Sequence, residues 1–328
     1  MNKSNENWVG WRRDIHRHPE LGFGEERTSA VVAERLESFG IETHTGIGGT
    51  GVVGVLRRGS GTRSVGLRAD IDALPIQEAN EFDHRSVNDG KFHGCGHDGH
   101  TAMLLAAAET LSAAESIDGT VNFIFQPNEE NGLGALAMMD DGLFERFEME
   151  AVYGMHNMPG IPAGHFAVRK GPMMTFEDNF VISIRGLGGH ASMPNRTRDP
   201  VMVAAEIISA LQTIVARSLN PMDSGVVSVT EVHTDGARNV IPSNVTIKGD
   251  TRGLSDHVQA LIEKRMREIV VNIGRAHNVD VTLDYSHEFI VLNNTDDETE
   301  VAIRAAVDTV GEDRVVPDCE PAAGSEDV

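Results

Sequence analysis

The sequence predicts an α/β protein with a mixed, mostly parallel sheet flanked by helices and a second, smaller domain inserted into it. Three observations support this prediction. The chain has 328 residues, more than one hydrophobic core usually organises, so about two domains are expected. Apolar strands alternate with helices over the first 156 residues, which is typical of a parallel sheet covered by helices. Beyond residue 171 the order changes to strand, helix, two strands, helix and strand.

The first half of the chain begins with two helices and continues with the alternating elements. A helix over residues 8–17 ends before Pro19, because proline disfavours helical geometry in the residue that precedes it. A second helix over residues 28–39 ends at Gly40. The strands expected next are 51–56, 64–70, 121–125 and 151–156, and the helices among them are 101–111 and 134–139.

Polar residues directly follow three of these strands, in segments 68–72, 126–130 and 155–157. The carboxyl ends of parallel strands meet at one edge of a sheet, so we expect an active site at that edge. Glu129 and Glu130 are neighbours at one such strand end, and we expect their side chains to point to different sides.

Residues 175–286 are predicted to form a ferredoxin-like βαββαβ domain. Its strands are 180–184, 226–233, 244–250 and 279–285, and its second helix spans 255–277. Asp199 caps the first helix, which begins at Pro200. The apolar face expected for that helix consists of Val201, Ala204, Ile208, Leu211 and Val215. Segments 1–174 and 287–328 then form the two parts of the larger domain.

The stretch from His93 to His100 concentrates one thiol, three imidazoles and a carboxylate in eight residues, next to a helix-forming run that starts at Thr101. A cysteine thiolate and a neutral imidazole are good ligands for a borderline-soft cation such as zinc, and the Cys95-X-His97 spacing lets both project from one turn. The alternative is a buried structural thiol beside a loop histidine.

The composition limits the classes of partner. A net charge of −22 argues against nucleic acid and against an anionic membrane, and no uninterrupted apolar run approaches a membrane span. The opening segment, residues 1–7, lacks the apolar core of a secretory signal, and two cysteines suit a reducing compartment, so we expect a cytoplasmic protein. The acidic, lysine-poor composition also suggests adaptation to high salt, a hypothesis that unfolding measured against salt would test.

Eight segments in order resemble the amidohydrolase branch of the co-catalytic metallopeptidases, which includes hippurate hydrolase, N-acyl-amino-acid amidohydrolases and auxin-conjugate hydrolases. The matching segments are RRDIHRHPEL (12–21), TGIGGTG (45–51), LRADIDALP (67–75), CGHDGH (95–100), FQPNEE (125–130), GMHN (154–157), GGHA (188–191) and NVIP (239–242). The resemblance covers nearly the whole chain and implies a zinc-peptidase-like catalytic domain carrying an inserted lid and dimerisation domain.

The resemblance also implies a site for two divalent metal ions, which are zinc, manganese or nickel. Its metal ligands would be Cys95, His97, Glu130 and His156, and Glu129 would be the general base. The alternative for Glu129 is a solvated loop carboxylate, but its position after an apolar strand and a proline favours the base.

Several further residues have two readings. Asp72 resembles a carboxylate that supports a ligand, or it forms a turn. Asp98 and His100 either orient a ligand or cap the helix at Thr101, while His16 and His18 more simply shape a helix end.

The inserted domain would contribute residues to catalysis and assembly. His190 resembles the imidazole that reaches the site of a neighbouring subunit and supports the oxyanion, which implies a homodimer through this domain; otherwise it is an ordinary loop histidine. Asn239 and Arg252 fall at substrate-contacting positions, and Arg252 could hold a substrate carboxylate bidentately.

The chain departs from the family pattern in two places. Relatives commonly have alanine where this chain has Asn128, and their sequences continue past the segment 324–327 with a further metal-ligand histidine. We therefore expect a truncated copy whose activity is in question. The predicted function is metal-dependent hydrolysis of a small N-acyl amino acid, hippurate-like or another acyl or aryl conjugate. The alternatives are a related metallo-carboxypeptidase, an N-acetyl-diamino-acid deacetylase and a non-catalytic dimerising remnant.

Overall fold

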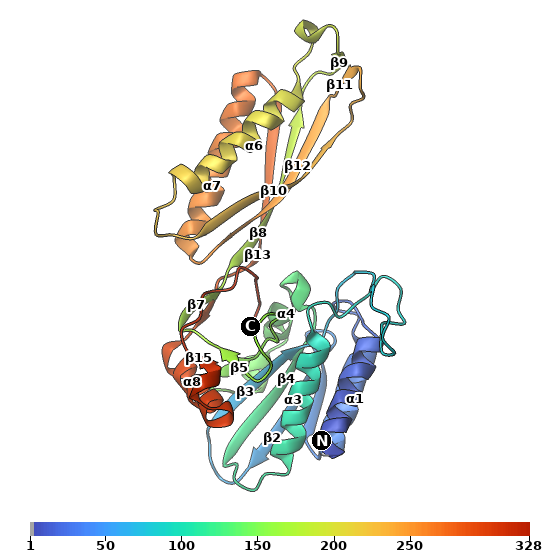
Figure 1. Ribbon diagram of the computed structural model, residues 1–328, viewed down its shortest axis with the longest axis vertical. Helices are drawn as coiled ribbons and strands as arrows, with labels where there is room; N and C mark the ends of the chain where they lie inside the picture. Colours follow the sequence, from blue (N-terminus) through green and yellow to red (C-terminus); the bar gives the residue numbers. More distant parts are fainter. Residues whose placement is uncertain (1–2) are drawn as a thin grey trace. The chain divides into compact units, whose positions relative to one another are not determined.

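The computed structural model describes residues 3–328, so Met1 and Asn2 of the opening segment lie outside the described residues. The chain divides into two compact units (Figure 1). The first unit runs up to His165 and also includes Asp327 and Val328, and the second runs from Phe166 to Glu326.

The first unit is built on a five-stranded mixed sheet with the strand order β1-β2-β4-β3-β5. Strands β3, β4 and β5 are parallel to one another, whereas β1 and β2 form an antiparallel hairpin and β2 runs antiparallel to β4. Its elements are α1 (Lys3–Arg17), α2 (Glu26–Ser38), β1 (Glu42–Ile47), β2 (Gly51–Arg58), β3 (Ser64–Asp70), α3 (His97–Ser112), β4 (Gly119–Gln126), η1 (Glu129–Asn131), α4 (Gly134–Asp140), α5 (Leu143–Arg146) and β5 (Val152–Gly154).

This sheet is the middle of three layers, because its strands are apolar on both faces. On β4, Phe123 and Phe125 pack with α2 and α3, while Ile124 between them packs with Met138 of α4 and Leu143 of α5. Successive side chains of a strand point to opposite faces, so one continuous apolar run serves two cores.

The sheet is mixed, as predicted, but it is not mostly parallel, because two of its four strand pairings are antiparallel. The difference comes from β1, which the sequence did not reveal because this edge strand buries only its last residue. The parallel part is the part that matters for the site. The carboxyl ends of β3, β4 and β5 lie at one edge, and the segments after them carry the predicted polar clusters.

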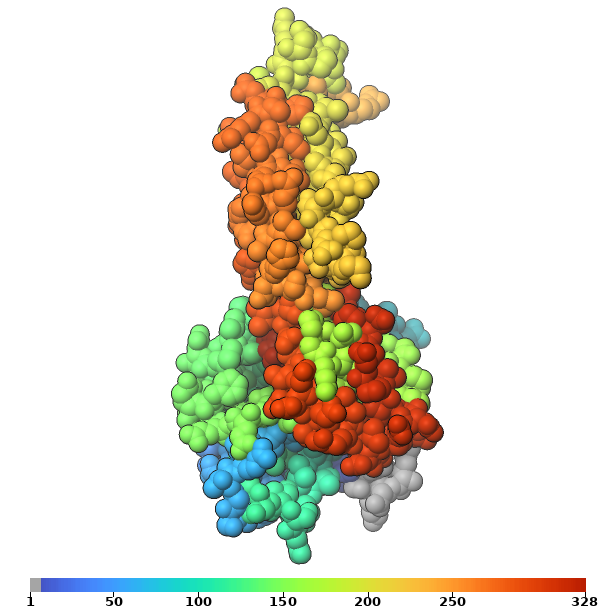
Figure 2. Space-filling model, turned by 90° about the vertical axis from the view of Figure 1, so that its left-hand side faces the viewer, coloured from blue at the N-terminus to red at the C-terminus, as the bar shows by residue number. Residues whose placement is uncertain are grey.

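The second unit contains the predicted ferredoxin-like domain. Its four-stranded antiparallel sheet has the order β10-β12-β8-β13 and two helices, α6 and α7, lie side by side on one face (Figures 1 and 2). The elements are β8 (Phe176–Arg185), α6 (Pro200–Arg217), β10 (Gly225–Thr234), β12 (Asn244–Gly253), α7 (Asp256–His277) and β13 (Asp280–Phe289), with the short β9 (Gly189–His190), η2 (Pro194–Arg196) and β11 (Val240–Ile241) between them. Its buried core consists of apolar side chains.

Helix α6 begins as predicted, since the Asp199 carboxylate accepts a hydrogen bond from the Val201 amide at 2.9 Å. The predicted apolar face is right for Ala204, Ile208 and Leu211 and wrong for Val201 and Val215. Val203, Ile207 and Ile214 are buried with Ala204 and Leu211, while Val201 and Val215 are exposed. Among the described residues, α6 is the one helix with the length and composition of a membrane span, and here its inner face packs on the sheet of the domain.

The remaining elements of the second unit flank this domain in the sequence. They are β6 (Phe166–Ala167), β7 (Gly171–Met174), β14 (Leu292–Asn294), α8 (Asp296–Val310), η3 (Glu312–Arg314) and β15 (Val315–Val316). β7 pairs with β14 and β6 pairs with β15, so segments before and after the ferredoxin-like part are joined to each other. The compact units therefore divide at residues 165 and 166, and the domain boundaries at 174 and 286 remain predictions.

Candidate metal centre

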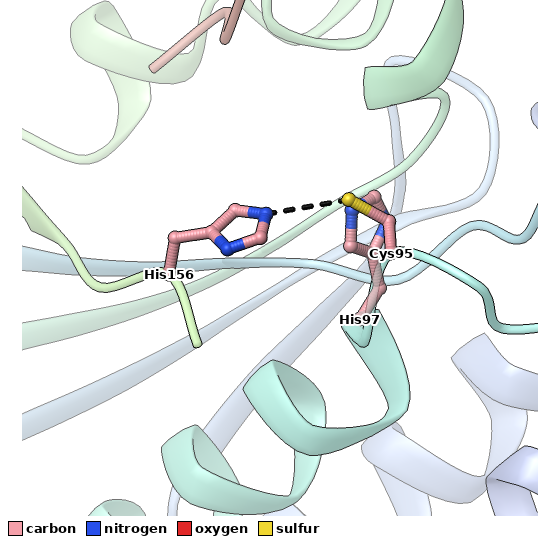
Figure 3. A group of neighbouring side chains, drawn as sticks. All are labelled: Cys95, His97 and His156. Atoms are coloured by element: carbon pink, nitrogen blue, oxygen red, sulfur yellow. Dashed lines mark hydrogen bonds between the residues drawn. The ribbon is translucent and has the colours of Figure 1, made fainter. Parts of the chain in front are cut away.

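Three predicted ligands meet at the amino-terminal end of α3. Cys95 Sγ lies 3.3 Å from His156 Nε2, and His97 completes a group whose ligand atoms all lie within 4.8 Å of one another (Figure 3). Gly96 separates the cysteine from the histidine with φ +95°, a left-handed conformation in which a Cβ would come 2.4 Å from the Asn157 side chain. Glycine thus lets both side chains leave the same tight turn toward one point.

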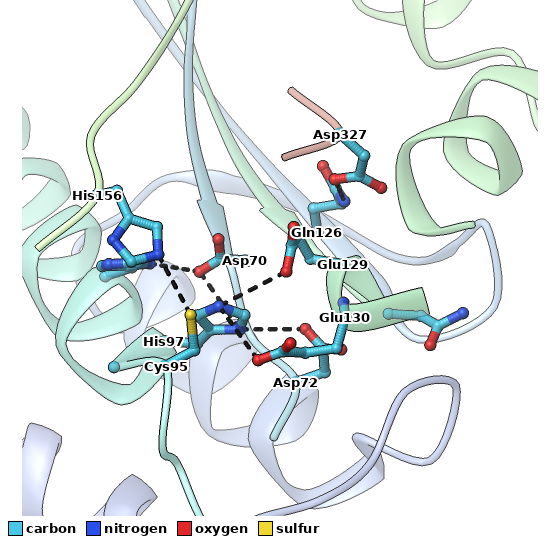
Figure 4. Close-up of polar contacts among 12 residues, drawn as sticks. Asp70, Asp72, Cys95, His97, Gln126, Glu129, Glu130, His156 and Asp327 are labelled. Carbon is cyan, nitrogen blue, oxygen red and sulfur yellow. Dashed lines mark hydrogen bonds and ion pairs between the residues drawn. The ribbon is translucent and has the colours of Figure 1, made fainter. Parts of the chain in front are cut away.

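His97 occupies the middle of the site and is almost fully buried. Its Nδ1 lies 3.2 Å from Asp72 Oδ1 and 3.7 Å from Asp70 Oδ1. Its Nε2 faces Glu129 and Glu130, each at 3.8 Å (Figure 4). Burial alone would lower the pKa of His97, but the Asp70 and Asp72 carboxylates outweigh it and raise that pKa to about 12. The surroundings of this ring therefore favour a positive charge.

Glu129 and Glu130 begin the short helix η1 after β4. We expected these neighbours to point to different sides, and that expectation is wrong, because both carboxylates approach the same nitrogen of His97. The reason is the backbone. Asn128 adopts a left-handed conformation at φ +49°, and the chain then turns tightly, which brings successive side chains together instead of alternating them. The Glu130 amide donates to Asp72 Oδ2 at 3.1 Å.

His156 and His100 are held by backbone contacts of the segment after β5. His156 Nδ1 donates to the Asn157 carbonyl at 2.6 Å, which leaves Nε2 as the nitrogen toward Cys95. His100 Nδ1 lies 2.6 Å from Asp70, and its Nε2 accepts the Asn157 amide at 3.0 Å. Both nitrogens of His100 thus have partners, and together they support the segment that carries His156.

Asp70 anchors this support from the end of β3. Its second oxygen lies 2.9 Å from Arg68, whose guanidinium also contacts Gln126 and Asp327 at 2.9 Å each. Burial opposes ionisation of Asp70, but Arg68, His97 and His100 lower its pKa far below the ordinary range. Asp70, Gln126 and Asp327 were not among the site residues predicted from the sequence. The first two stand in the polar clusters after strands, whereas Asp327 carries no local signal.

Asp98 points away from the ligands toward α1. Its carboxylate lies 2.9 Å from Arg12 and 2.9 Å from His16, and His16 also contacts Glu78 at 3.1 Å. His18 contacts the Asp14 carbonyl near the end of α1. Asp98 therefore ties the first turn of α3 to α1, and α3 begins at His97, four residues before the predicted start.

The predicted lid residues lie in the second unit at two separate places. His190 on β9 pairs with Val240 on β11, and the Asn239 carbonyl accepts the Ala191 amide at 3.0 Å, so His190 and Asn239 share one small ribbon (Figure 1). Arg252 lies near the other end of β12, eight residues beyond Asn244, or about 26 Å along the strand. It contacts Glu177 and Asp250 at 2.7 Å each.

The residues at the sheet edge of the first unit fit a divalent cation. The predicted ligands supply a thiol, two imidazoles and one carboxylate, with the Glu129 carboxylate beside them, and this set suits a transition-metal ion. Within residues 3–328, His97 Nε2 is buried and has no hydrogen-bond partner, although two carboxylates face it. A buried polar atom of this kind needs a partner, and a cation between the imidazole and the carboxylates supplies one.

Fold and site together define a metal-dependent amidohydrolase with an α/β catalytic unit. The chain matches the peptidase family M20/M25/M40 over residues 66–328 and belongs to that family. It is 40% identical to the hippurate hydrolase of Campylobacter jejuni over 316 residues, which are 96% of this chain and 82% of that protein.

Two further similarities agree. The chain is 40% identical to IAA-amino acid hydrolase ILR1-like 4 of Arabidopsis thaliana over 281 residues, covering 85% of this chain and 63% of the plant protein. The crystal structure of a dinuclear metal binding peptidase of the M20 family from Bacillus subtilis is similar with a TM-score of 0.83 at 31% identity, covering all of this chain and 85% of that one. The family resemblance seen in the sequence and the mixed α/β fold are confirmed.

Proposed function

We propose that this protein hydrolyses the amide bond of small N-acyl amino acids of the hippurate type. The observation that carries the proposal is the convergence of Cys95, His97, Glu130 and His156 beside Glu129 in one unit. The similarity to hippurate hydrolase and to an IAA-amino acid hydrolase supports an amino acid conjugate as the substrate.

The four ligands would hold two divalent metal ions, as the dinuclear relative from Bacillus subtilis suggests. The thiolate of Cys95 favours zinc, and manganese and nickel are the other candidates. When bound, such a pair of ions supplies Lewis-acid activation of water and of the amide carbonyl.

Glu129 is the proposed general base, since its carboxylate is buried and directed at the ligand group. It would remove a proton from the attacking water as the new carbon–oxygen bond forms. It would then deliver this proton to the nitrogen of the amino acid as the carbon–nitrogen bond breaks. Asp72 would hold His97 and the Glu130 amide in place during both steps.

The ferredoxin-like domain is proposed to form a homodimer and to bring His190 to the site of the partner subunit. His190 and Asn239 lie far from Arg252 along β12, so one active site of a single chain would not hold all three. This separation supports a site to which two subunits contribute. Arg252 would exchange its contacts with Glu177 and Asp250 for the carboxylate of the substrate.

The test is hydrolysis of hippurate by the purified chain, stripped with a chelator and reloaded separately with zinc, manganese or nickel. Glu129→Gln should lower kcat by about 10²–10⁴-fold with metal content unchanged, because it removes the base and leaves the ligands. The control is Glu145→Gln on the exposed surface of α5, which should match the wild type.

Full activity of Glu129→Gln would show that another group is the base. A wild-type chain that binds metal and releases carboxyl-terminal residues from peptides, or deacetylates diamino acids, would favour the corresponding alternative. Absence of metal binding would favour a non-catalytic dimerising protein.

A further inference from the structure

The loop that carries Glu129 and Glu130 is held by a buried carboxylate on each side. The Glu130 amide donates to Asp72 at 3.1 Å, and the Asn128 amide donates to Glu25 Oε1 at 2.9 Å. Glu129 lies between these two attachment points. Asp72 was singled out in the sequence, whereas Glu25 was not, and it lies about a hundred residues earlier in the chain.

Glu25 is completely buried in front of the first turn of α2. Its second oxygen accepts a hydrogen bond from Thr50 Oγ1 at 2.6 Å. A carboxyl group without solvent access needs partners for both oxygens, and the two partners here are the Thr50 hydroxyl and the Asn128 amide. The side chain therefore has one defined position, fixed by Thr50, from which it holds the loop.

The loop has little freedom to move away from Glu25. Asn128 itself is buried, and a Cβ at Gly22 would come 1.7 Å from Asn128 Oδ1, so the absence of a side chain at residue 22 leaves room for the Asn128 side chain. Asn128 has φ +49°, a conformation that asparagine tolerates better than alanine does. The backbone conformation at this position therefore suits asparagine.

We infer that Glu25 is a positioning residue for the Glu129–Glu130 pair, acting through its hydrogen bond to the Asn128 amide. The inference rests on the proposed function, because it assigns a purpose to the placement of the base and of one ligand. Catalysis depends on holding reacting groups within a fraction of an ångström, so slack in this loop is expected to affect turnover before it affects substrate binding.

The inferred role depends on a hydrogen bond and not on a charge. In Glu25→Gln the amide oxygen still accepts from the Asn128 amide, and the amide nitrogen donates to Thr50 Oγ1. Glu25→Ala removes both contacts and leaves the Asn128 amide buried without a partner. Glu25→Asp keeps the charge but withdraws the carboxylate from Asn128 by one methylene.

The experiment compares these three variants with the wild type in hippurate hydrolysis. Glu25→Ala should lower kcat about 10–100-fold, the range found when the supporting partner of a metal ligand is removed. KM should change by less than about twofold, because the lost contact acts on the transition state. Glu25→Gln should stay within about threefold of the wild type, and Glu25→Asp should fall between Gln and Ala.

The matched control is Glu20→Ala. The Glu20 carboxylate accepts from the amides of Arg27 and Thr28 in the first turn of α2, and it has no hydrogen bond to the loop. This variant should lower the melting temperature and leave kcat unchanged. An equal loss of kcat in Glu20→Ala would show that general destabilisation explains the effect and would overturn the inference.

Two other outcomes would also overturn it. One is full kcat in both Glu25→Ala and Glu25→Asp, or in Glu25→Asp alone if the alanine variant does not fold. The other is a Glu25→Gln variant as slow as Glu25→Ala or Glu25→Asp, which would assign the effect to charge.

Titration with Zn²⁺ or Mn²⁺ separates this inference from the proposed function, since Glu130 lies on the same loop. Glu25→Ala, or Glu25→Asp in its place, should bind the ion about 10-fold more weakly than the wild type, and Glu20→Ala should bind it equally well. A wild-type chain that binds metal without cleaving hippurate would contradict the proposed function only. Equal metal affinity in all variants would contradict the role of Glu25 in placing the ligand.

Discussion

Each unit of this protein contains a fully buried aspartate that binds a histidine, and the two aspartates have different consequences. In the first unit, Asp72 contacts His97 at 3.2 Å and the Glu130 amide at 3.1 Å (Figure 4). In the second unit, Asp178 contacts His287 at 2.9 Å and, through further bonds at 2.8 and 2.7 Å, Tyr285 and Gln259.

The two aspartates differ in the roles of their hydrogen-bond partners. The partners of Asp72 are the proposed metal ligand His97 and the backbone amide of the proposed ligand Glu130. Asp72 therefore orients residues that would bind metal. The partners of Asp178 belong to α7 and β13 and join these elements to β8. Tyr285 also contacts Thr251 at 2.7 Å, and burial, with Asp178, raises the pKa of its hydroxyl. Burial of a carboxylate thus says nothing of its role until its partners are known.

The largest effect expected from this comparison is on function, in Asp72→Ala. We expect activity and metal affinity to fall by as much as about 100-fold, because His97 and the Glu130 amide both lose their acceptor. Steady-state kinetics and metal titration measure this. Asp118→Ala is the matched control, since the Asp118 carboxylate also accepts two backbone amides, from Ser60 and Gly61, but in an exposed turn. Equal losses of activity and metal affinity in Asp72→Ala and Asp118→Ala would show that Asp72 has no special role at the site.

The second prediction concerns stability, in Asp178→Ala. It removes the buried carboxylate that Tyr285, Gln259 and His287 share, and the second unit should lose about 2 kcal/mol of unfolding free energy. Trp8 and Trp11, the two tryptophans of the chain, both lie in α1 and report on the first unit. In urea, circular dichroism should therefore show an earlier transition while fluorescence stays as in the wild type. A fluorescence transition that moves equally would contradict a role confined to the second unit.

The smallest expected effect is on the pH dependence of stability. It concerns a third buried carboxylate, Glu25. Burial raises the pKa of Glu25, although its hydrogen bonds with Thr50 and Asn128 act in the opposite direction. The folded protein then holds this proton more tightly than the unfolded chain, so unfolding free energy falls as the pH rises from the ordinary glutamate pKa through the raised one.

Glu25→Gln lacks this titration. Its unfolding free energy relative to the wild type should therefore increase across that pH window and stay level above it. Denaturant unfolding at several pH values between 4.5 and 8 measures the difference. A difference that is constant or decreases with pH would show that burial does not dominate at Glu25.

Much of the architecture could be predicted because its signals are local. Strand β3 was predicted with its observed bounds, and the βαββαβ order and the Asp199 cap of α6 were confirmed. Local signals did not identify the buried face of a helix whose apolar spacing fits more than one face. Helix α6 is apolar on more than one side, so periodicity could not tell that Val203 and Ile207 face the sheet while Val201 is exposed.

The chemistry of this protein could be predicted from the amino-acid sequence, because the residue types at the strand ends indicate the family and the class of reaction. Tertiary structure alone decided their arrangement. The left-handed turn at Asn128 aims both glutamates at His97, and Glu25 and Asp72 hold the loop between them. The physical reason is distance along the chain. A hydrogen bond between residues a hundred positions apart leaves no periodicity in either segment and arises only when packing brings them together.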